Sequence, residues 1–352
     1  MDGAATLSPD GLQTGLVPQV LAEYGAITRR HLRGYLPRRE PNDYLYALLA
    51  DYPQRDGKML RSSLCIAAAR ATGAPLEDAI PSAVSIELIH NALLVHDDIE
   101  DASDERRGTP TLHALHGVPL AINAGDAMGL LSVRPLVDNF GLLGPATALR
   151  ILSETEDVAW HSTEGQAFEL GWQRDNRTDL SDEDYLHMVL RKTCWLGTIH
   201  PLRVGCLIGS RGRLALQPLV RLGFFFGAAF QIQDDLLNLE PGPGYGKELN
   251  GDLFEGKRTL MVIHALRRAA AADARRLVRF LGKTRAQRSP REVLWVRALL
   301  ERTGALAHAR CVARGLAGAA LREFDDYFAR LPATRDLRFM RELLTWVLLR
   351  AR

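Results

Sequence analysis

The sequence predicts an all-α protein that folds as one large domain. Apolar residues recur at three- and four-residue spacing along almost the whole chain, which is the period of an amphipathic helix. Runs that alternate apolar with polar residues, which indicate strands, are essentially missing. No internal repeat and no Gly-, Ser- or Pro-rich linker divides the 352 residues. One domain over residues 17–352 is therefore preferred to the two domains that length alone suggests.

The expected helices follow one another closely along the chain. In order, they are Val20–Tyr35, Lys58–Ala71, Leu76–Asp101, Leu120–Leu142, Ala146–Gln173, Glu183–Gly209, Leu216–Leu239, Leu260–Phe280, Glu292–Arg302, Ala305–Arg330 and Leu337–Arg350. Residues that break helices separate them, namely Pro53, Gly73 with Pro75, Pro119, Gly144 with Pro145, and the loop 241–244. Ser181 followed by Asp184 is typical of a helix start.

Charge and cysteine content exclude several classes of protein. Apolar residues make up 47% of the chain, and 44 basic against 42 acidic residues leave a net charge of +2, which argues against a nucleic-acid partner drawn by overall charge. The four cysteines form no C-x-x-C pair, so a reduced, cytoplasmic compartment is expected. Residues 1–16 lack the features of a signal peptide and are interpreted as a flexible leader. The longest apolar run, Leu222–Phe230, is too short to span a bilayer, so no transmembrane segment is expected.

A first acidic cluster ends the helix predicted at Leu76–Asp101. Asp97 and Asp101 would lie one turn apart on one face, with Asp98 between them in sequence. Like charges at this spacing repel each other, and a divalent cation between them would reverse that repulsion. The pattern taken alone favours the plainer alternative, a solvated acidic helix end.

A second acidic cluster lies inside an apolar stretch. Asp234 and Asp235 stand between an aromatic run and Leu236-Leu237, where burial of unpaired carboxylates would cost several kcal/mol each. Metal ions or cationic side chains would neutralise them, and Asn238 repeats the one-turn spacing with an amide oxygen. Carboxylates without His or Cys nearby favour Mg²⁺, which is usually completed by water and substrate phosphates. Cations for such a ligand occur in short clusters at Lys58/Arg61, Arg106/Arg107, Lys192, Lys247 and Lys257.

These residues resemble the trans-type isoprenyl diphosphate synthases, also called polyprenyl synthetases. The resemblance covers about residues 55–260 and rests on several elements in the family's order: Gly57-Lys58 with Arg61, Asp97–Asp101 with Arg106-Arg107-Gly108, Gly165-Gln166, Lys192-Thr193, Phe230–Asp235, Gly246-Lys247 and Asp252–Lys257. The sequence departs from the family pattern at Asp56, Ser62, Glu169 and Asn238, and none of these removes a charge that the chemistry requires.

The resemblance implies an orthogonal bundle of long helices around a central cavity, in a homodimer. It also implies head-to-tail condensation of isopentenyl diphosphate with an allylic diphosphate of C5, C10 or C15, with about three Mg²⁺ ions as Lewis acids. By the same resemblance, Asp97, Asp101 and Asp234 bind the metal, with Asp98, Asp235 and Asn238 as further candidates. Isopentenyl diphosphate would contact Lys58, Arg61, His90 and Arg107. The allylic diphosphate would contact Arg106, Lys192 and Lys257, with Lys247 as a further substrate-binding candidate, and oxygens of Lys192, Thr193 and Gln231 would face the carbocation.

Product length is expected to depend on the residues one turn before Asp97. Ala92 and Leu93 are expected on the cavity side, and in the family bulky aromatics at these positions stop growth at C15. Their smaller size predicts the C20 product geranylgeranyl diphosphate, with C15 farnesyl diphosphate or a C25 product as alternatives. Residues on other helices could also form the floor of the cavity.

Two other functions fit parts of the pattern. A terpene cyclase of the same fold would need the metals but no second diphosphate site, and Lys58, Arg61, His90 and Arg107 favour the synthase. A non-catalytic regulatory subunit would be expected to lose a metal carboxylate, whereas Asp97, Asp101 and Asp234 are all present. The plainer alternative, a helical scaffold without a site, leaves the Asp234-Asp235 pair within an apolar run unexplained.

Overall fold

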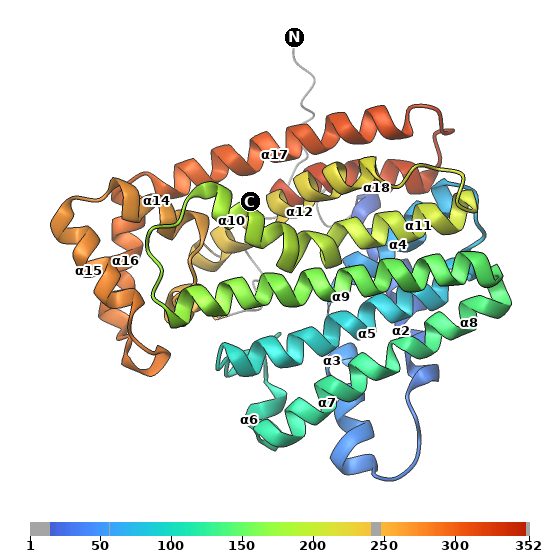
Figure 1. Ribbon diagram of the computed structural model, residues 1–352, viewed down its shortest axis with the longest axis horizontal. Coiled ribbons are helices and arrows are strands. Elements are labelled where there is room, and N and C mark those ends of the chain that lie inside the picture. Colours follow the sequence, from blue (N-terminus) through green and yellow to red (C-terminus); the bar gives the residue numbers. More distant parts are fainter. Residues whose placement is uncertain (1–14, 56, 241–247, 350–352) are drawn as a thin grey trace.

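The computed structural model describes residues 15–55, 57–240 and 248–349 (Figure 1). Several sequence-based expectations lie outside these residues: the leader up to residue 14, Asp56, the loop 241–244, Gly246, Lys247 and the helix end at Arg350. Within the described residues the fold is almost entirely helical, as predicted.

The long helices of the bundle match the expected ones closely. They are α2 (Leu16–Tyr35), α4 (Leu60–Ala71), α5 (Leu76–Glu100), α9 (Pro145–Arg174), α12 (Pro218–Leu239), α16 (Pro290–Arg302), α17 (Ala305–Phe328) and α18 (Arg335–Leu349). Helix α2 begins at Leu16, the last residue assigned to the leader.

Three expected helices are divided in the structure. The helix expected at Leu120–Leu142 becomes α7 (Val118–Leu131) and α8 (Val133–Leu143). The helix expected at Glu183–Gly209 becomes α10 (Asp182–Val189), the π-helix η2 (Leu190–Ile199) and α11 (His200–Ser210). The helix expected at Leu260–Phe280 becomes α14 (Leu260–Arg268) and α15 (Ala271–Leu281). Ser181 caps α10 as expected, since its hydroxyl accepts from the Asp184 N–H and the Asp184 carboxylate accepts from the Ser181 N–H. The third division occurs because Ala269 adopts an extended backbone conformation.

Short elements that the periodicity did not indicate complete the chain. They are the π-helix η1 (Asn42–Tyr46), α3 (Ala47–Gln54), α6 (Leu112–His116), α13 (Gly251–Glu255), the 3-10 helix η3 (Arg285–Gln287) and a hairpin of β1 (Glu105–Arg106) with β2 (Thr109–Pro110). Pro53, expected as a breaker, lies inside α3. Elements of this length offer too few residues for an apolar period to be visible.

The central helices pack closely because small residues allow their backbones to approach. A Cβ atom at Gly205 of α11 would lie 2.4 Å from the Cys65 carbonyl oxygen of α4, so only glycine permits this contact. Figure 1 shows α9, α11 and α12 running side by side through the middle of the molecule, with α5 below α9. This packing brings the C-terminal ends of α5 and α12, which carry the two acidic clusters, to one cavity.

Helix α5 is the one helix, among the residues the structure describes, that is long and apolar enough to cross a membrane. Its most apolar window is 61% buried inside the protein, which is typical of a core helix. Its apolar character is explained by packing against α4, α7 and α8.

Candidate active site

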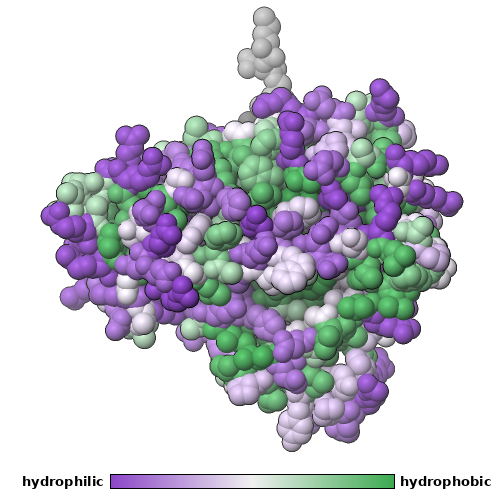
Figure 2. Space-filling view, viewed as in Figure 1, coloured by the Kyte–Doolittle hydropathy of each residue, from purple (hydrophilic) through white to green (hydrophobic). Residues whose placement is uncertain are grey.

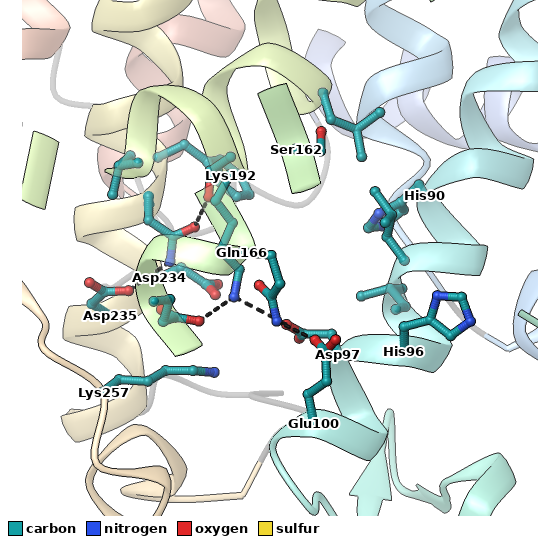
Figure 3. Close-up of a pocket in the computed structure, with 18 of the residues that line it drawn as sticks. His90, His96, Asp97, Glu100, Ser162, Gln166, Lys192, Asp234, Asp235 and Lys257 are labelled. Atoms are coloured by element: carbon teal, nitrogen blue, oxygen red, sulfur yellow. Dashed lines mark hydrogen bonds and ion pairs between the residues drawn. The ribbon is translucent and has the colours of Figure 1, made fainter. Parts of the chain in front are cut away.

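A cavity of about 810 Å³ lies between α5, α9, η2 and α12 and contains most of the expected site residues. The residues of interest that line it are Lys58, Arg61, His90, Leu93, Asp97, Arg106, Arg107, Lys192, Thr193, Gln231, Asp234, Asp235, Asn238 and Lys257. Figure 3 shows Asp234 and Asp235 on the side of the cavity opposite Asp97 and His90. The cavity therefore brings together two acidic clusters separated in sequence by more than a hundred residues.

Asp97 is held at the centre of a cationic group. The Lys192 Nζ atom lies 3.1 Å from its Oδ1 atom, and the Gln166 side-chain amide donates to the same oxygen at 3.4 Å. Burial opposes ionisation of Asp97, but Lys192, Lys257 and Arg106 outweigh that effect and lower its pKa. Asp97 is therefore an anion that can accept a metal ion.

Lys192 is positioned by α9 as well as by Asp97. Its ammonium group donates to Glu169 of α9, and the backbone of Lys192, in η2, lies directly against Gly165, which is also in α9. Burial disfavours the charged form of Lys192, yet Asp97 and Glu169 raise its pKa. The Lys192 side chain therefore stays cationic beside the cavity. Gly165 allows close approach of the Lys192 backbone, and Gln166 binds Asp97, the partner of Lys192.

Asp101 is buried and does not line the cavity. Its Oδ2 atom accepts from Lys257 at 2.7 Å, and Lys257 also pairs with Glu255 at 2.7 Å. The pKa of Asp101 is raised overall, because burial and the nearby Asp97 together outweigh the opposing effect of Lys257. The Asp101 Oδ1 atom is buried without a hydrogen-bond partner, which is costly for a carboxylate oxygen unless a ligand satisfies it.

Asp98 has a structural role. It is fully buried, and it accepts hydrogen bonds from the Arg106 Nε atom at 2.7 Å, from the Arg106 Nη2 atom and from the Tyr52 hydroxyl. Its side chain is therefore occupied by Arg106 and turned away from the cavity, which argues against its candidacy as a metal ligand. Arg106 still lines the cavity, and its guanidinium lies 3.7 Å from Asp97.

In the second acidic cluster, Asp234 and Asp235 both line the cavity but have different surroundings. Asp235 is buried, accepts from the Tyr185 hydroxyl at 2.7 Å and from the Gln231 amide at 2.7 Å. The Thr193 hydroxyl in turn donates to the Gln231 Oε1 atom at 2.9 Å. The pKa of Asp235 is raised overall, because the effect of burial exceeds the opposing effect of these two hydrogen bonds. The chain of hydrogen bonds fixes Thr193 and Gln231 next to the cavity.

Asn238 uses its amide to hold the neighbouring segment. Its side-chain oxygen accepts from the Asp252 backbone N–H at 3.1 Å, and its amide nitrogen donates to the Glu248 carbonyl at 3.3 Å. These bonds position α13, which brings Asp252 to the cavity wall. One accepted hydrogen bond does not exclude metal ligation by an amide oxygen, so the role of Asn238 as a metal ligand stays a prediction.

A second group of cations lies on the α4 and α5 side of the cavity. Arg61 lies 3.2 Å from the His90 Nε2 atom, and its own Nε atom is buried without a partner. Burial and the adjacent Arg61 and Arg107 lower the pKa of His90. Lys58 lies over the Trp346 ring of α18, at 5.6 Å from the centroid. An anion entering here would meet several cations together with a neutral imidazole.

The two residues expected to limit product length do not lie on the same wall. Leu93 lines the cavity, whereas Ala92 is buried in the core with residues of α3 and α7. One residue along a helix corresponds to about 100° of rotation. Leu93 shares the face of Asp97, four residues later, and Ala92 does not. The expectation that Ala92 faces the cavity was therefore wrong.

Sequence reasoning did not find several side chains that support the site. They are Tyr52 and Tyr185, which bind Asp98 and Asp235 from distant elements, and Ser162, whose buried hydroxyl lines the cavity without a hydrogen-bond partner. No periodicity distinguishes these residues, because each acts through a contact that only the fold creates. Glu169 was noticed as a departure from the family pattern, and its ion pair with Lys192 gives it a function.

The donor set fits Mg²⁺. Within residues 15–55, 57–240 and 248–349, no three His, Cys, Asp or Glu side chains are close enough to hold a metal by themselves. Mg²⁺ does not require such a cluster, since it binds one or two carboxylates and completes its shell with water and substrate phosphates. Asp97 and Asp234 on the cavity wall, and the unsatisfied Oδ1 atom of Asp101, supply oxygen ligands of the right kind.

Comparison with known proteins agrees with this arrangement. The model of the polyprenyl synthetase family matches residues 42–296. A short chain isoprenyl diphosphate synthase of Methanothermobacter thermautotrophicus is 36% identical over 261 residues, which cover 73% of this chain and 76% of that protein. A (2E,6E)-farnesyl diphosphate synthase of Mycobacterium tuberculosis is 37% identical over 262 residues, covering 73% and 70%.

The fold is similar to that of a solved structure. The crystal structure of geranylgeranyl pyrophosphate synthetase from Pyrococcus horikoshii superposes with a TM-score of 0.82 at 28% identity, over 95% of this chain and 98% of that one. The likeness covers the whole bundle, including the C-terminal helices that the family model leaves out.

Proposed function

This chain belongs to the polyprenyl synthetase family, and from that premise we propose that it is a trans-prenyltransferase that condenses isopentenyl diphosphate head-to-tail with an allylic diphosphate. The observation that carries the proposal is the presence of two separate cation groups on one cavity. One group surrounds Asp97 with Lys192, and the other joins Arg61 to His90. Two groups are what two diphosphate substrates require, whereas a cyclase needs only one.

Each group binds one substrate. Lys192, Lys257 and Arg106 bind the allylic diphosphate. Lys58, Arg61, His90 and Arg107 bind isopentenyl diphosphate, with Lys247 outside the described residues. Asp97, Asp101 and Asp234 hold Mg²⁺, about three ions by likeness to the family, with Asp235 held in place by Tyr185. Bound Mg²⁺ supplies Lewis-acid stabilisation of the departing diphosphate.

The chain itself contributes position and electrostatics to the reaction. The C–O bond of the allylic substrate breaks, the double bond of isopentenyl diphosphate attacks the allylic carbon, and a proton leaves to the released diphosphate. The Gln231 oxygen, positioned by the hydrogen bond from Gln231 to Asp235, and the Thr193 oxygen, positioned by its hydrogen bond to Gln231, face the positive charge that develops. The apolar wall that includes Leu93 excludes water, which would otherwise capture the carbocation.

We propose a C20 product, geranylgeranyl diphosphate, with Leu93 forming part of the wall along which the chain grows. Leu93 leaves more room beside Asp97 than an aromatic side chain would. The relatives include a farnesyl diphosphate synthase, so C15 is the alternative outcome of the product test.

We also propose that residues 17–352 act as one domain and that two copies form a homodimer in the cytoplasm. Large apolar side chains are exposed along neighbouring helices, namely Val118, Ile122 and Leu130 of α7, Val133, Val137, Phe140 and Leu142 of α8, and Leu149, Leu152, Trp160 and Phe168 of α9. Figure 2 shows hydrophobic side chains over the part of the surface formed by α7 and α8. Such a continuous exposed patch favours an interface. Sedimentation equilibrium tests it, and a monomer at micromolar concentration would refute the homodimer.

The activity is tested by incubating the pure protein with isopentenyl diphosphate, Mg²⁺ and each of the C5, C10 and C15 allylic diphosphates, followed by mass analysis. The expected result is a longer allylic diphosphate, and Asp97→Ala and Asp234→Ala should each reduce its formation at least about a thousandfold while the helical circular dichroism spectrum is unchanged. Asp326→Ala, an exposed change of the same kind on α17, is the matched control. A hydrocarbon formed without isopentenyl diphosphate would indicate a cyclase, and no turnover with any primer would refute the proposal.

A further inference from the structure

One end of the molecule carries a concentration of positive charge that the net charge of the chain conceals. Residues 267–302 contain eleven Lys and Arg against three Asp and Glu, whereas the whole chain has a net charge of only +2. This stretch comprises the end of α14, α15, η3 and α16, which form the orange end of the bundle in Figure 1. Figure 2 shows hydrophilic side chains gathered over this end, with a few hydrophobic ones among them.

Most of these cations form no ion pair with the residues that the structure describes. Arg267, Arg268, Arg275, Arg276, Arg279 and Arg291 are exposed, and no described residue forms an ion pair with them. Exposed arginines elsewhere, such as Arg174 and Arg341, pair with neighbouring carboxylates at 2.7 Å. Two basic residues of the stretch are structural, since Arg288 donates to buried carbonyl groups and Arg285 pairs with Glu255 at 3.5 Å. The unpaired cations are therefore a surface feature rather than part of the core.

A groove lies at the centre of this basic surface. It encloses about 270 Å³ between α15 and α16 and is lined by Arg276, Arg279, Phe280, Lys283, Glu292 and Trp295. The Arg276 guanidinium lies 4.0 Å from the centre of the Trp295 ring, and Lys283 pairs with Glu292. Because Glu292 neutralises Lys283, the guanidinium groups of Arg276 and Arg279 are the groups in the groove that can donate hydrogen bonds to a phosphate.

Apolar side chains stand beside the cations. Leu294 is 60% exposed on α16, next to Trp295, whose ring borders the groove. Arginine with tryptophan and an exposed aliphatic side chain is typical of surfaces that lie at the boundary between lipid headgroups and acyl chains. A nucleic acid would favour free aromatic faces for base stacking, whereas Arg276 already covers the Trp295 ring.

We propose that the face formed by α15 and α16 binds the surface of an anionic bilayer, with a phospholipid headgroup phosphate in the groove between Arg276, Arg279 and Trp295. Binding to an anionic surface neutralises the unpaired arginines, and Leu294 enters the headgroup region. Arg285 and Glu255 connect this face to Lys257 in the cavity, so it lies at the end where diphosphates bind. If the proposed function holds, an apolar product is released beside a membrane that can accept it.

The test measures co-sedimentation of the full chain with vesicles in the absence of substrates. Wild-type protein is expected to bind phosphatidylglycerol–phosphatidylcholine vesicles, to bind pure phosphatidylcholine vesicles weakly, and to dissociate as salt increases. Each cation near an anionic surface contributes about a fivefold change in partitioning, so Arg276→Gln with Arg279→Gln should weaken binding about 25-fold. The matched control is Arg314→Gln with Arg322→Gln on α17, which removes the same charge from another exposed face.

Several outcomes would overturn the proposal. They are equal binding to neutral and anionic vesicles, equal loss in the control pair, or binding of inorganic phosphate or RNA at the groove without any vesicle binding. Prenyltransferase activity measured without vesicles should be the same in all variants, which shows that each variant is folded. If the wild-type protein shows no prenyltransferase activity, the proposed function is refuted. The vesicle-binding result would still test the membrane proposal, because it is measured without substrates.

Discussion

Gly165 in α9 is the position where the smallest substitution should have the largest effect on the site. An added Cβ atom would lie 2.1 Å from the Lys192 backbone nitrogen and 2.5 Å from its Cα atom. Because both are backbone atoms, no change of rotamer relieves the contact. The neighbouring segments must separate by about 1.3 Å or more before ordinary van der Waals contact is restored.

The separation would act on both stability and catalysis. Overpacking of this kind lowers the free energy of unfolding by about 1–3 kcal/mol. It would also move Lys192 away from Asp97, whose Oδ1 atom it now contacts at 3.1 Å. A displacement of about 1 Å in a substrate-positioning group can reduce kcat about a hundredfold. Gly165→Ala should therefore reduce kcat far more than its loss of stability would explain.

Gly171→Ala is the matched control, because it lies on the same helix and its Cβ atom would have nothing within 4 Å. Removing a helical glycine there should raise the free energy of unfolding by about 0.5–1 kcal/mol and leave kcat unchanged. The assay combines urea unfolding with kcat and KM for the allylic diphosphate. Equal stability and equal kcat in the two variants would refute the idea that α9 positions Lys192.

Three further changes test other parts of the structure. Leu93→Phe should shift the product to a shorter chain, because Leu93 lines the cavity. Ala92→Phe should instead lower the free energy of unfolding by about 1–3 kcal/mol, because Ala92 is buried in the core. Mass analysis that shows a shorter product only with Ala92→Phe would contradict the assignment of Leu93 to the cavity wall. Tyr185→Phe removes the donor to Asp235, so the free energy of unfolding should fall by about 1–3 kcal/mol and Mg²⁺ activation should require a higher concentration; unchanged values would argue against this hydrogen bond. Burial lowers the pKa of His200 from 6.5 to about 3, so the unfolded chain binds the extra proton and stability falls as pH decreases from 6.5 toward 3. Between pH 7 and pH 5 the free energy of unfolding, measured with urea, should fall by about 2 kcal/mol less in His200→Asn than in the wild type. An equal fall in both proteins would contradict this prediction.

The long helices could be predicted because their apolar period is sustained over several turns. Helices α5 and α12 were expected to within two residues at each end, so the sequence placed Asp97 and Asp234 near the C-terminal ends of long helices. The cavity that these ends share was implied by the family resemblance and not by periodicity. Helix α3 was missed because it is short and contains Pro53. The division between α14 and α15 was missed because Ala269, in an alanine-rich run, gives no local signal for an extended backbone.

The roles of individual acidic residues could not be predicted in the same way. Asp97 and Asp98 are adjacent in sequence and equally acidic, yet only Asp97 lines the cavity, while Asp98 is occupied by Tyr52 and Arg106. Asn238 has the spacing of a metal ligand, and its oxygen also accepts from the Asp252 backbone. In these cases the deciding partner lies on another element, so spacing within one helix carries no information about it.

The sequence by itself determined the helical class, the order of the long helices and the family to which the two acidic motifs point. These follow from local properties, namely apolar periodicity and the residue types within a few turns. The tertiary structure alone decided that Leu93 rather than Ala92 lines the cavity, that Lys192 is supported by Gly165 and Glu169, and that Arg276 and Arg279 of α15 border one groove with Trp295 of α16. Each depends on which faces of distant helices meet, and that is set by close packing of the whole core rather than by any single segment.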